Sequence, residues 1–131
     1  MNRTVYVLLI VLILVPISSL PLHAASTDIV INEIAASESS DHEWIEIYNK
    51  GTAAIDLTGW KFFEENTNHG LSAFRGDMTI DPGEYAVIAD VAANTAADYP
   101  SFAGTILDSS WSTLTESGES LALKDNTGTI I

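Results

Sequence analysis

One stretch, residues 43–60 (EWIEIYNKGTAAIDLTGW), limits most strongly what this chain can fold into. Its first seven residues alternate, so that Ile45 and Ile47 point to one side of an extended chain and larger polar and aromatic side chains point to the other. The turn-forming residues at 49–51 end this strand, and after a second turn Trp60 begins another apolar run. The stretch therefore predicts a β-domain with Ile45, Ile47 and Trp60 in its core.

Similar patterns predict further strands along the chain. Trp60 and Phe62 share a face of their strand, and Leu121 and Leu123 point inward from theirs. A tight turn at 125–128 follows the last of these strands. The strands expected besides 43–49 are 29–35, 60–64, 78–80, 84–89 and 119–124.

The intervening segments carry weaker signals. Residues 65–77 show no periodicity and predict a long loop, and residues 101–117 are weakly patterned with a few inward apolar side chains. The alanine-rich residues 91–98 predict one short helix, with Asp90 as its cap and Pro100 ending it.

The first 24 residues are typical of a signal peptide. Arg3 is the basic residue near the start, residues 5–15 are apolar, and Leu22-His23-Ala24 resembles a cleavage site. The apolar run before Pro16 is shorter than the roughly 20 residues needed to span a bilayer, which favours cleavage after Ala24 over a retained anchor. We therefore expect one mature domain, residues 25–131, in the secreted or cell-envelope fraction.

The composition excludes some partners. Four basic residues against eighteen acidic ones leave the mature domain with a net charge of −14, which repels nucleic acid and anionic membranes. We expect no direct contact with nucleic acid and no membrane contact apart from the signal peptide. The chain has no cysteine, so an exported domain is held without disulfides, which fits a prokaryotic protein better than a small eukaryotic secreted one.

Five motifs in order resemble the lamin tail domain family over residues 29–131. They are INE at 31–33, EWIEIYNKG at 43–51, DLTGW at 56–60, IDPGEYAVI at 80–88 and GESLALKDNTGTII at 118–131. The resemblance implies an all-β, immunoglobulin-like sandwich, to which the residues add one short helical segment. It also implies a secreted or surface module of the prokaryotic type, since a signal peptide excludes a nuclear lamin.

The resemblance attaches no catalytic residue to the module, and the residues give no reason to add one. The mature part has two histidines, His42 and His69, both expected in solvated loops, and no serine lies in a G-x-S-x-G motif. We therefore expect no catalytic residue and no bound cofactor. Calcium is the one metal worth considering, because Glu38, Asp41 and Glu43 could offer oxygen ligands, although no calcium-loop motif is present.

Trp44 and Tyr48 flank Glu46 on the face opposite the core isoleucines. Exposed aromatic side chains of this kind can stack on sugars or anchor a protein partner. Cross-strand packing that stiffens the sheet is the simpler explanation, and both remain open.

The leading hypothesis is a non-enzymatic, exported binding or structural module with a protein, glycan or envelope partner. The alternative is the accessory domain of a larger secreted hydrolase, of nuclease or phosphatase type, with its catalytic part beyond residue 131. A last strand is expected to begin at residues 129–131, where the sequence ends, so we also expect a truncated final sheet edge that could pair with a second copy.

Overall fold

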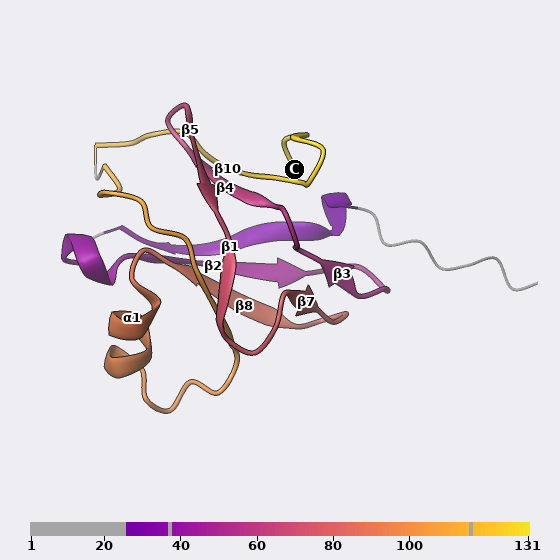
Figure 1. Cartoon of the computed structure of the whole chain (residues 1–131), viewed down its shortest axis with the longest axis horizontal. Helices are drawn as coiled ribbons and strands as arrows, with labels where there is room; N and C mark the ends of the chain where they lie inside the picture. Colours follow the sequence, from indigo (N-terminus) through magenta and orange to yellow (C-terminus); the bar gives the residue numbers. More distant parts are fainter. Residues whose placement is uncertain (1–25, 37, 116) are drawn as a thin grey trace, which may run out of the picture.

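Ten β-strands within the described residues form a five-stranded sheet, a three-stranded sheet and a two-stranded ribbon (Figure 1). The structure is a computed structural model and describes residues 26–36, 38–115 and 117–131. The segment predicted to be a signal peptide, residues 1–24, lies outside the described residues. None of the helices in the described ranges is both long and apolar enough to cross a membrane.

The five-stranded sheet has the order β1-β2-β8-β9-β6. Its pairs are antiparallel except β8 with β9, which are parallel because the chain crosses over between them through α1 (Ala92–Asp98). The bounds of its strands are β1 (Ile29–Ala35), β2 (Trp44–Asn49), β6 (Ser72–Arg75), β8 (Tyr85–Ala89) and β9 (Thr105–Asp108).

The smaller elements complete the sandwich. In Figure 1 the ribbon lies at the opposite end of the molecule from α1. Lys124, at the end of the edge strand β10, forms an isolated antiparallel bridge with Ile130. The three-stranded sheet has the order β10 (Leu121–Lys124), β4 (Lys61–Glu64), β5 (Thr67–Gly70); the ribbon pairs β3 (Ile55–Asp56) with β7 (Thr79–Ile80); and single 3₁₀ turns lie at η1 (Ser26–Asp28) and η2 (Ser40–His42).

The main core is formed by apolar side chains from both sheets and the ribbon. Of the side chains expected there, five are buried: Ile45, Ile47, Trp60, Phe62 and Leu123. Leu121 is half-buried and packs against the same cluster. The architecture is the immunoglobulin-like β-sandwich that the resemblance implies, with the one short helix that the residues predict.

Residues 65–77 do not form the predicted loop. They contain β5 and β6, each at the edge of its sheet. Most of their side chains are exposed on both faces, so backbone pairing holds them and no alternation of apolar residues marks them. Residues 101–117 likewise contain an unpredicted strand, β9, whose first three residues are all buried.

The predicted cap of α1 is also wrong. Val91 occupies the N-cap position, and the Asp108 carboxylate at the end of β9 accepts a hydrogen bond from the Ala92 backbone N–H at 2.9 Å. The Asp90 side chain is instead buried and accepts a hydrogen bond from the backbone of Trp111. The backbone N–H of Ala92 is thus satisfied by Asp108, which is distant in sequence, and not by Asp90, which the local pattern favours.

Asn49, expected only to help end a strand, is a fully buried polar residue. Its side-chain amide donates to the carbonyls of Ala53 and Ile80, both at 2.9 Å, and its oxygen accepts from Gly51 N–H at 2.9 Å. The amide therefore has partners for both N–H groups and for its oxygen. It joins the end of β2 to the following turn and to β7.

Replacing Asn49 by Asp should destabilise the domain by about 3 kcal/mol or more, because the carboxyl group cannot donate to the two carbonyls and would bury a charge beside them. Urea unfolding followed by tryptophan fluorescence measures the change. Asn66→Asp, at an exposed position, is the control and should shift stability by about 0.5 kcal/mol or less. Equal effects of the two substitutions would show that the Asn49 network does not stabilise the fold.

Candidate functional site

The face of the five-stranded sheet that points away from the main core carries a row of large side chains, and we call it the outer face. The alternation of β2 brings Trp44, Glu46 and Tyr48 to it. Antiparallel pairing with β8 places Tyr85 opposite Tyr48 and Val87 opposite Glu46. The sequence prediction that Trp44 and Tyr48 lie opposite the core isoleucines thus agrees with the strand geometry.

Tyr48 and Tyr85 form a stack at one end of the outer face. Their ring centroids are 4.5 Å apart and the planes are inclined by 28°. Directly opposed aromatic residues stabilise an antiparallel pair, so cross-strand packing accounts for Tyr48. Tyr85 nevertheless remains 44% exposed, which leaves an aromatic surface open to a partner.

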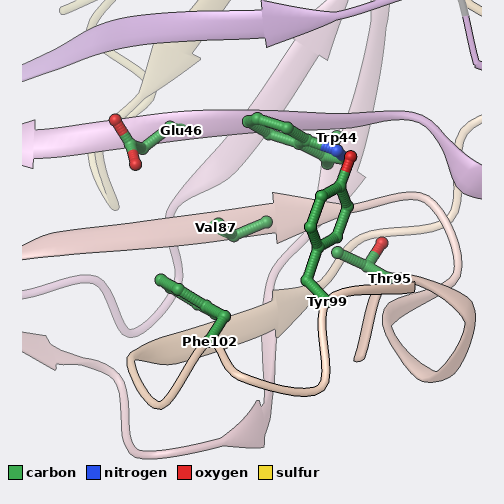
Figure 2. A pocket seen from close by; sticks show the side chains of 6 residues that line it. All are labelled: Trp44, Glu46, Val87, Thr95, Tyr99 and Phe102. Carbon is green, nitrogen blue, oxygen red and sulfur yellow. The ribbon is translucent and has the colours of Figure 1, made fainter. Parts of the chain in front are cut away.

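A small pocket lies at the other end of the outer face, where α1 and the chain after it cover the sheet (Figure 2). Figure 2 shows Val87 between Trp44 and Phe102, with Tyr99 toward one end and Glu46 toward the other. The pocket has a volume of about 130 Å³, and Thr95 of α1 completes its lining. A separate cluster of buried apolar residues supports it: Val87, Ala89, Ala92 and Ile106.

Two rings of the pocket meet at nearly a right angle. The centroids of Trp44 and Tyr99 are 5.9 Å apart with an interplanar angle of 86°. The Tyr99 side chain comes from the connection between α1 and β9 and is 41% exposed. The pocket is therefore partly open and lined mainly by aromatic and aliphatic surface.

The polar groups of the pocket are few. Glu46 accepts a hydrogen bond from Asn32 of β1 through Oε1 at 2.7 Å. The indole N–H of Trp44 and the hydroxyl of Thr95 are buried without a hydrogen-bond partner among the described residues. Buried polar atoms without a hydrogen-bond partner are uncommon in folded proteins, so the two atoms distinguish this pocket from ordinary core packing.

Sequence reasoning missed Tyr85, Tyr99 and Phe102. Tyr85 lies in the predicted strand 84–89, but the sequence alone does not show which residue it faces. Tyr99 and Phe102 stand close together in the polar segment after α1, and two aromatic residues in such a segment are a signal that could have drawn attention to them.

The three calcium candidates do not share a site. Glu38 and Asp41 are exposed, whereas Glu43 is 1% exposed. Glu43 Oε2 accepts hydrogen bonds from the indole N–H of Trp111 at 3.0 Å and the backbone N–H of Leu114 at 2.7 Å. No group of three or more His, Cys, Asp or Glu side chains in the searched part of the chain is placed to hold a metal ion.

The two histidines pair with carboxylates. His42 in η2 bonds the Asp98 carboxylate, and this hydrogen bond raises the pKa of His42. His69 was expected in a solvated loop but lies half-buried on β5, with Nε2 3.1 Å from Oε2 of Glu64. Burial, and then the charge of Glu119, raises the pKa of Glu64. Both histidines therefore lie against carboxylates that belong to the fold.

Asp90 lies in an acidic environment where β8 leads into α1. It is 4% exposed. Burial, and then the negative charge of Asp41, raises its pKa to about 6, with Glu43 and Asp108 adding smaller contributions. Since an aspartate in the unfolded chain has a pKa near 3.8, Asp90 binds its proton more tightly when folded.

Comparison with known families supports the fold. The family described as Lamin Tail Domain matches residues 23–131, which is most of the chain. No curated protein matches the chain significantly.

Replacing Asp90 by Asn should remove one pH-dependent loss of stability. Between about pH 4 and pH 6 the unfolded aspartate ionises before the folded one, so the folded state loses stability as the pH rises; above pH 6 the loss is constant. An amide cannot ionise. From about pH 3 to about pH 8 the variant should therefore gain about 2 to 3 kcal/mol relative to the wild type.

Urea unfolding at both pH values measures this difference. The control is Asp81→Asn, at an exposed position of a turn that accepts either residue. Its stability relative to the wild type should be nearly independent of pH. The raised pKa of Asp90 would be contradicted if Asp90→Asn changed stability by the same amount at both pH values.

Proposed function

Since the chain belongs to the lamin tail domain family, a non-catalytic immunoglobulin-like fold, we propose that it is a binding module that contacts its partner through the outer face. The partner is a protein, a glycan or another component of the cell envelope. The observation that carries this proposal is the gathering of two aromatic groups on one sheet face, the Tyr48–Tyr85 stack and the pocket beside Trp44.

Exposed aromatic surface favours binding for a physical reason. Tyr and Trp bury a large area at a small entropic cost and combine an apolar ring with a polar atom, so they are enriched at binding sites. Tyr85 and Tyr99 are each more than two-fifths exposed and lie on either side of Glu46 and Val87. This arrangement leaves an aromatic surface that the fold itself does not cover.

We further propose that the domain is exported to the envelope or medium of a prokaryotic cell. The basic start, the apolar run and the small-residue site of residues 1–24 support export, and the absence of cysteine supports a prokaryotic source. The excess of acidic residues makes nucleic acid and anionic membranes poor partners.

The intact mass of the natural gene product, recovered separately from the envelope and the medium, tests export and domain context. A mass near that of residues 25–131 supports a cleaved, free-standing module. A much larger mass supports the alternative of an accessory domain beside a hydrolase. An uncleaved chain retained inside the cell would contradict the proposed export.

The outer face is tested by passing solubilised envelopes of the source cells over the immobilised domain and measuring what it retains. We expect the immobilised wild-type domain to retain a partner, and the double substitution Tyr85→Ala with Tyr99→Ala to weaken this retention at least about 10-fold, because both rings are exposed anchors. Quantitative mass spectrometry and glycan profiling of the eluates measure the loss.

Phe74→Ala is the matched control. Phe74 is an equally exposed aromatic residue, but it lies on the edge strand β6, away from the two aromatic groups. Retention that falls with Phe74→Ala and not with the double substitution would assign binding to that edge and overturn the proposal.

A further inference from the structure

The pocket at Trp44 is lined by three aromatic rings and one carboxylate. Trp44 and Glu46 come from β2, and Tyr99 and Phe102 come from the connection between α1 and β9 (Figure 2). The rings of Trp44 and Tyr99 are nearly perpendicular and form two adjacent walls of the pocket. Aromatic faces carry partial negative charge, so walls of this kind attract a cation.

Glu46 adds a full negative charge to the same pocket. One of its oxygens bonds the Asn32 amide, which is neutral, and no basic side chain in the described ranges forms a salt bridge with it. The chain as a whole has a formal net charge of −13. Charge complementarity therefore favours a positively charged occupant.

The size of the pocket selects among cations and other ligands. Its volume of about 130 Å³ suits a compact group of a few non-hydrogen atoms. Sites for drug-sized ligands are larger, from about 300 Å³ upward. The volume thus argues against a whole sugar residue inside the pocket.

The shortage of hydrogen-bond acceptors narrows the choice further. A primary ammonium group needs partners for three N–H donors, whereas a quaternary ammonium group needs none. Besides Glu46, the lining offers only the hydroxyls of Thr95 and Tyr99 as side-chain acceptors. Aromatic walls with one carboxylate are the usual surroundings of quaternary ammonium groups in proteins.

We propose that this pocket binds the trimethylammonium group of a choline-like cation. The inference rests on the proposed function, because it assigns a ligand class to part of the outer face. A free cation is favoured over a phosphorylated one, since a phosphate beside the ammonium group would be repelled by the acidic surface. Arg75 is not part of the lining, but its guanidinium group lies 5.5 Å from the centroid of the Phe102 ring, so this ring already contacts one cation. The perpendicular rings of Trp44 and Tyr99 therefore supply the aromatic faces for the ligand.

Titration with choline chloride, followed by NMR of the tryptophan indole N–H groups, tests the proposal. Trp60 and Trp111 are buried in the main core, so Trp44 should be the indole that shifts. We expect saturable binding with a dissociation constant on the order of 1 mM, as befits a small ligand. The neutral isostere 3,3-dimethyl-1-butanol should bind at least about 10-fold more weakly, because it lacks the charge.

Variants locate the site. Tyr99→Leu should weaken choline binding about 10-fold and Glu46→Gln up to about 5-fold, while the wild-type unfolding temperature is largely kept. Phe74→Leu replaces a similarly exposed aromatic residue on the edge strand β6, outside the pocket lining, and should leave choline binding unchanged.

Several outcomes would overturn the inference: no saturable shift of Trp44, equal binding of the neutral isostere, or tighter binding of phosphocholine than of choline. The titration needs no natural partner and the retention experiment needs no choline. If choline fails while Tyr85→Ala with Tyr99→Ala still abolishes retention, the ligand assignment is wrong and the proposed function stands. If choline binds but Tyr85→Ala with Tyr99→Ala leaves retention of the partner unchanged, the outer face is not the partner surface.

Discussion

The buried amide of Asn49 is the polar constraint on which the arrangement of the sheets depends. Its hydrogen bonds join the end of β2, in the five-stranded sheet, to β7 of the ribbon. If β2 shifted in register, the buried Asn49 amide would lose its partners, and buried polar groups without partners are costly. Glu43 plays a comparable part at the other end of β2, where its carboxylate holds the irregular segment after β9 through Trp111 and Leu114. Buried polar side chains thus fix both ends of β2 by hydrogen bonds, and Ile45 and Ile47 between them pack into the core.

The strands that could be predicted from sequence are those that carry a clear alternation or, like β8, an apolar run after a recognisable turn. β2 and β4 alternate clearly, since one side of each packs into the core, and the turn before β8 contains the glycine that its positive φ requires. β5 and β6 could not be recognised, because edge strands exposed on both faces carry no periodic signal. β9 was missed for the opposite reason, since a run of only three buried residues is too short to distinguish from an apolar turn.

Within the candidate site, the sequence predicted the residues of β2 but not those that other elements contribute. Alternation placed Trp44 and Tyr48 on the outer face, but a single strand does not reveal which residues lie opposite or above it. Tyr85 depends on the pairing of β2 with β8, and Tyr99 depends on the path of the chain after α1. The role of Glu43 was hidden in the same way, because its partners lie 68 and 71 residues further along the chain.

The capping of α1 by Asp108 has a consequence for how the pocket is built. A helix of seven residues is too short to persist alone, and here its first turn is held by the strand that follows it. The segment η2 holds the helix at two further points: the Asn94 amide donates to the Asp41 carbonyl, and the Asp98 carboxylate in the last turn bonds His42. Tyr99 and Phe102 lie between helix and strand, so their positions exist only while this crossover is closed. The shape of the pocket therefore depends on the closed crossover as well as on the sheet beneath it.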